Sequence, residues 1–341
     1  MISKNTHFFN SDKILFERAL QKMHQIPIDQ QREAPDSWEA QRYETTLNSS
    51  CGLKGPGTYK KTRQSTLILE PSDSPGWWFD RTDIEQQLPI RVSTRNVWDT
   101  QRNITLKSGF PNNYVRMVEH IISQRLGMGL DNLVIKMENG DPPLFNVGSM
   151  PIVEAINKVG IRENKKRPLT YWTVKNPIVI MNKKQDGFLF LEPEMKKPGL
   201  LSCDCAIDFP NVIGQQRILF DLTKQIYEYG AQARTNCSLE TVIFVKTVGK
   251  LFSDFRNLGY NWKNILIAGK KSYWNTPALL CNQKSLEAVW HRACLDLIAA
   301  LSLQETGRLC GKITSYKAGH ALDVELMTLL LRHDLLIPYQ F

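Results

Sequence analysis

The sequence lacks the features that mark membrane-spanning, secreted and disulfide-bonded proteins. Among its 341 residues, no apolar run approaches the ~20 residues that a bilayer-spanning helix requires. The first ten residues have neither the apolar core nor the small-residue cleavage site of a secretory signal, so we expect a cytoplasmic protein. Its seven cysteines are odd in number and irregularly spaced, which argues against a disulfide framework.

Acidic residues are the minority among the charged side chains, 34 against 43 basic ones, which gives a net charge of +9. This excess favours an anionic partner, such as a phosphorylated substrate or an anionic membrane surface that the protein contacts peripherally. The basic residues are dispersed and no nucleic-acid-binding module is recognisable, so we expect no nucleic-acid partner. With 42% apolar and 23% charged residues, the composition is that of a globular chain long enough for two domains.

The order of strand, helix and turn patterns predicts an α+β fold. Residues 1–42 read as an N-terminal extension and linker with an amphipathic helix over 11–23. The first α+β domain is predicted over 43–165 and the second over 166–341. A strand-helix-strand insert is predicted in the second domain at about 241–268.

Within the domains, runs of apolar residues with helical or strand-like spacing predict individual elements. The predicted helices cover 112–126, 151–159, 219–229 and 321–331. The predicted strands include 131–137, 178–181, 187–191 and 313–316, and, in the insert, 241–246 and 264–268 on either side of a helix at 248–258.

Three histidines and one glutamate stand beside apolar framework. Glu119 and His120 are adjacent in a helical pattern, His291 lies in a second predicted helix, and His320 follows Gly319 between a strand and the closing helix. The Glu119-His120 pair alone is a weak signal, and a lone helical histidine such as His291 is more often a surface or packed residue. His320 is a stronger signal, because a Gly-His turn at the end of a strand can present an imidazole rigidly to a cleft. Together they suggest a hydrolytic zinc site, which combines imidazole ligands with a carboxylate base.

The segments around these histidines read Met117-Val-Glu-His120, Trp290-His-Arg-Ala-Cys-Leu-Asp296 and Tyr316-Lys-Ala-Gly-His-Ala-Leu322. They resemble the Thr-Val-Glu-His, Arg-His-Lys-x-Leu-Asp and Tyr-Lys-x-Gly-His-Ala-Leu motifs of the UDP-3-O-acyl-N-acetylglucosamine deacetylases of lipid A biosynthesis. Motif order and spacing agree from about residue 43 to the C-terminus. The resemblance implies two similar α/β sandwich domains with the active site between them, Zn²⁺ as cofactor and a UDP-linked acylated glucosamine as substrate.

The same resemblance implies a role for each polar residue of the site. These roles are the base (Glu119), the general acid or oxyanion stabiliser (His320), a polar group near the carbonyl oxygen (Thr235), the zinc ligands (His120, His291 and Asp296) and the substrate-binding residues (Arg292 and Lys317).

The spacing of the third ligand departs from the family motif. His291 and Asp296 are five residues apart where the motif has four, which places them about 140° apart on a regular α-helix. A one-residue π-bulge would bring Asp296 round to the face of His291. Alternatively, Cys294 at i+3 would supply a thiolate, or the third ligand is lost.

Two further departures affect the expected function. The acidic residue that would orient His320 falls at Ala299 or Ala300, and Asn236 replaces a phenylalanine. Losing one such outer partner costs 10- to 100-fold in metal affinity or activity. The leading expectation is zinc-dependent deacetylation, with the acyl chain in an apolar passage formed by the 241–268 insert. The alternative is a catalytically impaired homologue that binds the nucleotide-sugar lipid or regulates the pathway.

Overall fold

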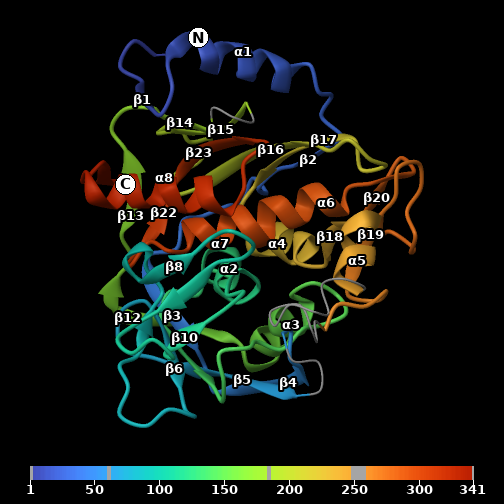
Figure 1. The fold of residues 1–341 in the computed structure, drawn as a ribbon. Helices are drawn as coiled ribbons and strands as arrows, with labels where there is room; N and C mark the ends of the chain where they lie inside the picture. The colour runs from blue at the N-terminus through green and yellow to red at the C-terminus, as the bar shows by residue number, and fades with distance from the viewer. Residues whose placement is uncertain (1–2, 60–62, 183–185, 247–258, 340–341) are drawn as a thin grey trace.

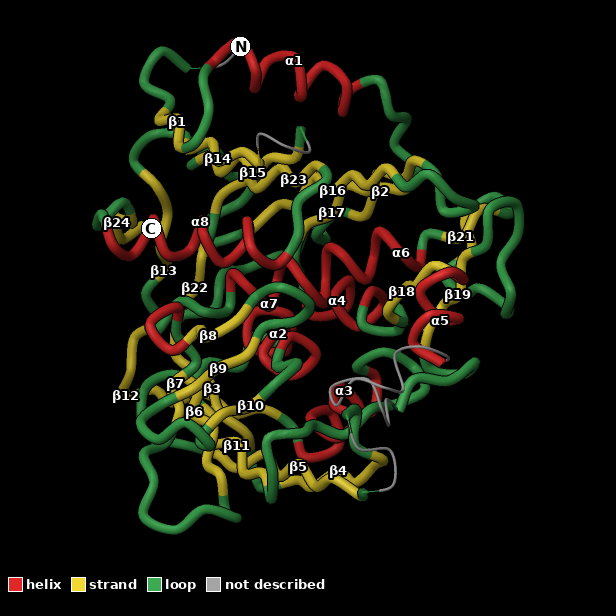
Figure 2. Tube along the Cα trace, in the orientation of Figure 1, coloured by secondary structure: helices red, strands yellow, loops and turns green. Residues whose placement is uncertain are grey.

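Two β-sheets enclose a layer of helices in the computed structural model, which describes residues 3–59, 63–182, 186–246 and 259–339 (Figure 1). Figure 2 shows the helices of this layer between the two groups of strands, with one further helix, α1, outside the upper sheet. This arrangement confirms the α+β class that the sequence predicts. No helix in the described part of the chain is both long and apolar enough to cross a membrane.

The upper sheet has seven described strands and mixes parallel with antiparallel pairs. In spatial order they are β1 (His7–Phe9), β14 (Ile178–Asn182), β15 (Gly187–Glu192), β23 (Gly311–Tyr316), β16 (Leu201–Asp208), β17 (Gln215–Asp221) and β2 (Gln30–Arg32). The layer below it contains α4 (Lys224–Gly230), α6 (Glu287–Trp290), the π-helix η4 (His291–Leu297), α7 (Ile298–Leu301) and α8 (His320–Arg332).

The lower sheet has five described strands, and the helix α2 (Glu119–Gly127) packs between it and α7. In spatial order the strands are β4 (Cys51–Pro56), β5 (Gln64–Pro71), β11 (Leu133–Met137), β6 (Trp77–Arg81) and β7 (Ile90–Arg91). Beside this sheet lie α3 (Met150–Val159), the short helix η1 (Thr94–Asn96) and the three-stranded sheet of β10 (Tyr114–Val115), β9 (Thr105–Lys107) and β8 (Val97–Asp99).

Smaller sheets complete the described chain. They are β12 (Ile161–Pro168) with β3 (Tyr43–Leu47); β22 (Arg308–Leu309), β13 (Tyr171–Val174) and β24 (Leu336–Tyr339); β18 (Thr235–Ser238) with β19 (Ile265–Ala268); and β20 (Leu280–Cys281) with β21 (Lys284–Ser285). The helix α5 (Leu239–Lys246) lies against β18 and β19.

Successive side chains of β14 pack in two different apolar clusters, one on each face of the upper sheet. Val179 and Met181 pack in the cluster beneath α1, whereas Ile178 and Ile180 belong to the large core of the helical layer. Because successive strand residues point to opposite faces, a fully apolar strand indicates a sheet covered on both sides. The N-terminal helix α1 (Lys13–His24) supplies that second cover, as its buried side chains show: Phe16, Ala19 and Met23.

The N-terminal extension is part of the upper sheet. Its strand β1 pairs with β14 at one edge, and β2 pairs with β17 at the other. The predicted helix over 11–23 is confirmed as α1, which Asp12 caps by accepting the N–H of Leu15 at 2.9 Å. The extension therefore protects both edges of this sheet from pairing with other chains.

Two predicted helices begin at the wrong residue. The helix predicted over 112–126 begins only at Glu119, because Tyr114 and Val115 pair in a strand. The first three residues of the helix predicted over 219–229 belong to β17, and α4 begins at Lys224. The predicted domain boundary between residues 165 and 166 lies within the strand β12.

The insert keeps its predicted order of strand, helix and strand but in a different register. Its first strand is β18, and residues 241–246, predicted as a strand, lie in the helix α5. Their β-branched side chains favour strands only where a neighbouring strand can pair with them, and β18 already holds the place beside β19. The predicted strand 264–268 is confirmed as β19, and the predicted helix 248–258 lies outside the described residues.

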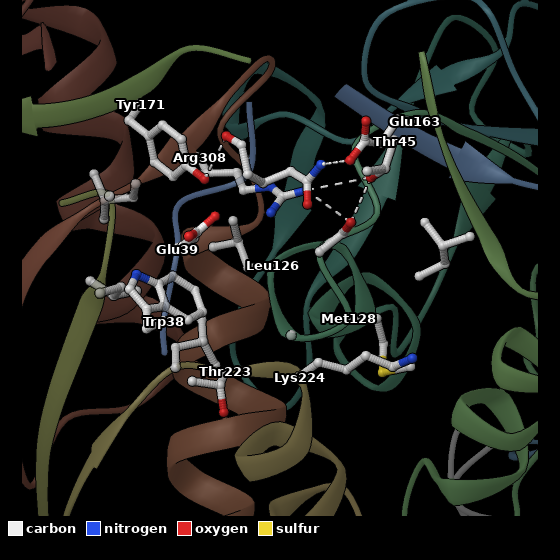
Figure 3. Close-up of a pocket in the computed structure, with 18 of the residues that line it drawn as sticks. Trp38, Glu39, Thr45, Leu126, Met128, Glu163, Tyr171, Thr223, Lys224 and Arg308 are labelled. Carbon is white, nitrogen blue, oxygen red and sulfur yellow. Dashed lines mark hydrogen bonds between the residues drawn. The ribbon is translucent and has the colours of Figure 1, made fainter. Parts of the chain in front are cut away.

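Arg308 connects the second predicted domain to the first. Its guanidinium donates to both oxygens of Asp131 at 2.8 Å and to the carbonyl of Gly129 at 2.9 Å. Figure 3 shows Arg308 reaching toward Thr45 across the wall of a cavity of about 370 Å³. Thr45 also donates its backbone N–H to Asp131, so one buried carboxylate links three segments.

Replacing Arg308 with methionine should lower the free energy of unfolding by about 3–5 kcal/mol, because Asp131 stays buried without its cation. Urea denaturation of the two proteins measures this difference. The matched control is Arg95→Met, since Arg95 is 83% exposed and its pair with Glu305 should contribute less than about 1 kcal/mol. Equal losses in the two variants would contradict a special role for Arg308.

Candidate active site

Glu119 and His120 form the first turn of α2, at the floor of the helical layer. Met117, two residues earlier, has a φ of 48°, which a non-glycine residue rarely adopts and which turns the chain sharply into the helix. Glu119 Oε2 accepts the backbone N–H of Ile104 at 3.0 Å. The carbonyl of His120 accepts the hydroxyl of Ser149 at 3.0 Å, so both residues are held firmly.

His291 and Asp296 lie in a π-helix, η4, that interrupts the helix formed by α6 and α7. A π-helix has more residues per turn than an α-helix, so residues five apart share a face. His291 Nδ1 is accordingly 3.6 Å from Asp296 Oδ1. Of the three arrangements that the sequence leaves open, the structure has the π-bulge.

Cys294, the alternative third ligand, lies in the protein core. It is fully buried, and a Cβ built on Gly230 would approach its sulfur to 2.4 Å, so the thiol packs against α4. Burial raises the pKa of Cys294, which keeps the thiol protonated and unsuited to metal binding. Burial and packing therefore favour Asp296 over Cys294 as the predicted third ligand.

His320 is the first residue of α8, after the turn that joins it to β23. The left-handed conformation in this turn belongs to Lys317, with a φ of 47°, whereas Gly319 is extended and could be any residue. His320 Nε2 lies 3.8 Å from Asp296 Oδ1, the same carboxylate oxygen that lies 3.6 Å from His291 Nδ1. Strained non-glycine residues thus precede both His120 and His320, as is common at functional sites.

The two histidines of different predicted domains converge on Thr235, the first residue of β18. The ring centres of His120 and His291 are 5.3 Å apart. Thr235 Oγ1 is 3.0 Å from His291 Nε2 and 3.4 Å from His120 Nε2. The structure therefore brings together Glu119, His120, Thr235, His291, Asp296 and His320, which the sequence predicts as one site.

Burial and neighbouring charges set the protonation states of these groups. Burial, and then the nearby His291, lowers the pKa of His120 to about 3, so its imidazole is neutral at pH 7. Burial raises the pKa of Glu119 above its ordinary value. Burial opposes the charge of Asp296, but the adjacent His291 and His320 outweigh it and hold the pKa of Asp296 well below its usual range.

The pKa of His320 is shifted in the opposite direction to that of Asp296. Burial disfavours its charged form, but the carboxylates of Asp296 and Glu119 outweigh this effect and raise the pKa of His320. The imidazolium is therefore stabilised next to an ionised aspartate. Such a group can donate a proton or stabilise a developing negative charge.

The donor set fits a zinc ion. Neutral imidazoles and an ionised carboxylate are zinc ligands, and two ligands at 2.0–2.1 Å from one ion lie about 3.4 Å apart, close to the separation of His291 and Asp296. Asp296 Oδ1 is buried and has no hydrogen-bond partner among the described residues. As the side chains stand, no three His, Cys, Asp or Glu residues of the described chain could hold an ion.

A cavity of about 430 Å³ opens beside Asp296 and His320. Its lining combines polar groups with a small apolar wall: Ile207, Asp208, Phe209, Asn236, Ala288, Arg292, Asp296, Lys317, Ala318, Gly319 and His320. The volume suits a small-molecule ligand of ordinary size. A second, narrow crevice begins on the other side of Thr235 and His120 and is lined mainly by apolar residues from Met117 to Ile152.

Lys317 and Arg292, predicted to bind substrate, differ in whether their charged groups are available to a ligand in the cavity. Lys317 Nζ lies on the cavity, 3.9 Å from Asp208. Arg292 is buried, donates to Asp323 at 2.6 Å and to the carbonyl of Ala318 at 3.0 Å. Its guanidinium therefore holds the turn before His320, and only Nη1 has no partner among the described residues.

Asp323 is a site residue that the sequence reasoning missed. It is fully buried three residues after His320, on the same face of α8, and its charge contributes to the raised pKa of His320. The signal was present, because an aspartate on the apolar face of a predicted helix is unusual unless it has a partner. Asp323 and Asp296 supply the negative charge that Ala299 and Ala300 cannot provide.

In the described part of the insert, only Asn264 lines either of the two cavities at the site. Ile265 and Ile267 are buried in β19, whereas Ile243 and Phe244 of α5 are 54% and 47% exposed. Neither cavity at the site is lined by any of these four residues. Residues 247–258 of the predicted insert lie outside the described residues.

Comparison with known proteins agrees with this geometry. A sequence model of the UDP-3-O-acyl N-acetylglycosamine deacetylase (LpxC) family matches residues 44–332. A UDP-3-O-acyl-N-acetylglucosamine deacetylase of Syntrophus aciditrophicus is 29% identical over 292 residues, 86% of this chain and 87% of the relative. Proteins of the same name from Helicobacter pylori strain 26695 and Myxococcus xanthus are each 28% identical, over 84% and 83% of this chain and 91% and 84% of their own lengths. The chain belongs to the UDP-3-O-acyl-N-acetylglucosamine deacetylase family.

Proposed function

We propose that this protein is a zinc-dependent hydrolase that removes the acetyl group from UDP-3-O-acyl-N-acetylglucosamine in lipid A biosynthesis. The observation that carries the proposal is the π-helix η4, which places Asp296 beside His291 despite their five-residue spacing. The family match and the names of the relatives support the reaction and the substrate.

The ion would be held by His120, His291 and Asp296. The lowered pKa values of His120 and Asp296 leave the first neutral and the second ionised, as metal binding requires. When bound there, zinc would lower the pKa of a water molecule and polarise the acetyl carbonyl group. His291 and Asp296 would bind it from η4, and His120 would bind it from α2.

The remaining residues move protons and stabilise charge. Glu119 accepts a proton from the attacking water through Oε1, since Oε2 already accepts the N–H of Ile104. The oxygen of water bonds to the acetyl carbon, the bond from that carbon to nitrogen breaks, and acetate and a free amine result. His320, held as imidazolium by Asp296, protonates the departing nitrogen or stabilises the oxyanion, and the Thr235 hydroxyl donates to that oxygen.

The cavity beside His320 would receive the sugar nucleotide. Lys317 presents its ammonium group there and favours a phosphate oxygen, and Arg292 Nη1 offers a buried donor. Phe209 and Ile207 form an apolar wall on which a sugar or a base can pack.

Acetate release from UDP-3-O-acyl-N-acetylglucosamine by zinc-loaded protein tests the proposal. We expect turnover that a chelator removes and that added zinc restores. The control is chelated protein, whose substrate binding is measured in parallel by calorimetry. Binding without acetate release under any metal condition would contradict the proposed reaction and support the impaired homologue that binds the nucleotide-sugar lipid.

The pH dependence of turnover should be bell-shaped. Glu119 acts ionised, so activity rises with pH through its raised pKa, and His320 acts protonated, so activity falls as pH passes its own raised pKa. Asp323→Asn removes one negative charge and leaves Arg292 unneutralised, which should move the alkaline limb to lower pH by about one unit. The acidic limb is the internal control, and an unmoved alkaline limb in a folded variant would contradict the role of Asp323.

A further inference from the structure

A hairpin at the edge of the insert presents tryptophan and lysine side chains together. β19 runs into the turn Gly269–Ser272, closed by the N–H of Gly269 donating to Ser272 at 3.0 Å, and the chain returns along β19 through Tyr273 and Trp274. Lys270 and Lys271 form the exposed tip. Trp274, on the returning segment, is 56% exposed.

The side chain of Asn275 fixes a second tryptophan next to this hairpin. Its amide donates to the carbonyls of Trp262 at 2.8 Å and Ile265 at 2.7 Å, and its oxygen accepts the N–H of Ile267 at 2.9 Å. Trp262 is 51% exposed, and the exposed Lys263 follows it. The hairpin and Trp262 thus form one rigid unit, which we call the tryptophan-lysine hairpin (residues 262–275).

The charged side chains of the tryptophan-lysine hairpin are all positive. Between residues 255 and 286 the sequence has no aspartate or glutamate. Lys263, Lys270 and Lys271 form no ion pair with any residue in the described ranges, whereas Lys284 is bound to Asp29 at 2.7 Å. A rigid surface with three unpaired ammonium groups attracts an anionic partner.

The apolar side chains around the hairpin indicate which anionic partner fits. The neighbouring helix α5 exposes Ile243 and Phe244, and residue Leu280 beyond the hairpin is 59% exposed. Tryptophan and lysine flanked by aliphatic side chains are typical of surfaces that lie in the headgroup region of a bilayer. A nucleic acid would use the aromatic rings and the lysines but not the aliphatic groups.

The hairpin is continuous with the rim of the active-site cavity. The carbonyl of Gly269 accepts the N–H of Val212 at 3.1 Å, and Phe209, at the start of that loop, lines the cavity. On the other side, β19 pairs with β18, whose first residue is Thr235. Figure 1 shows β18, β19 and α5 together at one end of the molecule.

We propose that the tryptophan-lysine hairpin docks the protein on an anionic lipid bilayer, with the active-site cavity opening beside the membrane surface. This goes beyond the proposed reaction, and its test measures binding alone, so the two can fail independently. Tryptophan rings would lie among the headgroups, and the lysines would meet acidic lipids.

Co-sedimentation with vesicles tests the proposal, using phosphatidylcholine alone and a 70:30 mixture with phosphatidylglycerol, at low and high salt. We expect binding to the mixed vesicles that salt weakens. Lys263→Gln/Lys270→Gln/Lys271→Gln should lower the partition coefficient roughly 100-fold, at about fivefold per lysine. The matched control is Arg162→Gln/Lys165→Gln/Lys166→Gln, which removes three exposed charges from β12 at the other side of the molecule and should change it less than about threefold.

A second set of variants tests the contribution of the two exposed tryptophans to vesicle binding. Trp262→Ala/Trp274→Ala should weaken binding at least about tenfold, whereas Trp98→Ala, an equally exposed tryptophan on β8, should not. Equal losses in the two charge variants, or no loss in the tryptophan pair, would overturn the proposal. Binding to a single-stranded oligonucleotide more tightly than to mixed vesicles would assign the surface to nucleic acid and overturn it equally.

Discussion

Glu119→Gln should lower turnover by about 10³-fold or more while leaving zinc bound. Glutamine keeps the shape of the side chain and its contact with the N–H of Ile104, but it cannot accept the proton of water. Glu119 is buried beside the predicted ligands, so no exposed carboxylate can substitute for it. Acetate release and zinc content, measured on the same preparation, separate loss of the base from loss of the metal.

The control for this variant is Glu325→Gln, which makes the same chemical change on an exposed face of α8. We expect its turnover to match that of the parent protein. If Glu119→Gln retained more than a tenth of the parent activity, Glu119 would not be the base.

Asp296→Ala should lower zinc affinity by more than about 100-fold and remove turnover, because losing a ligand costs more than losing one of its outer hydrogen-bond partners. It also removes the charge that holds His320 protonated, so added zinc should restore little activity. Zinc affinity is measured by competition with a chromogenic chelator.

Cys294→Ala is the matched variant within the same π-helix. Its thiol packs against Gly230, so we expect unchanged zinc affinity and a loss of about 1 kcal/mol in the free energy of unfolding. Zinc affinity that falls in Cys294→Ala and not in Asp296→Ala would reverse the ligand assignment.

Each histidine of the predicted site lies at or next to the start of an element: His120 is the second residue of α2, His291 the first of η4 and His320 the first of α8. Short motifs point to these residues, although the sequence places the start of the first of these helices too early, at 112. Their convergence across the two predicted domains follows from the family resemblance rather than from any local pattern. The predicted strands 178–181 and 187–191 are confirmed. Their unbroken apolar runs are typical of strands that are buried on both faces of a sheet, so the sequence identifies them clearly.

The π-helix is the part of the site that sequence alone leaves open. Spacing shows that His291 and Asp296 are out of register on an α-helix, and it is equally consistent with a thiolate ligand or with a lost ligand. The choice depends on packing: Cys294 is enclosed between η4 and α4, where Gly230 leaves room for its sulfur. Such a contact joins residues far apart in sequence and has no signature in a linear motif.

Asp323 supplies a negative charge near His320 that a comparison of motifs alone does not detect. The family position for an orienting acid falls at Ala299 or Ala300, both buried among apolar residues. The negative charge instead comes from Asp296 and from Asp323, one turn after His320 on its own helix. A motif scored position by position reports a loss where the three-dimensional site keeps the charge.

X-ray absorption at the zinc edge of the metal-loaded protein tests the central claim most directly. We expect one zinc per chain with a first shell of nitrogen and oxygen at about 2.0–2.1 Å, of which two ligands are imidazoles. This shell should be lost in Asp296→Ala, and the spectrum should be unchanged in Cys294→Ala. A sulfur scatterer at about 2.3 Å, or protein that binds no zinc, would contradict the claim that η4 restores the ligand set.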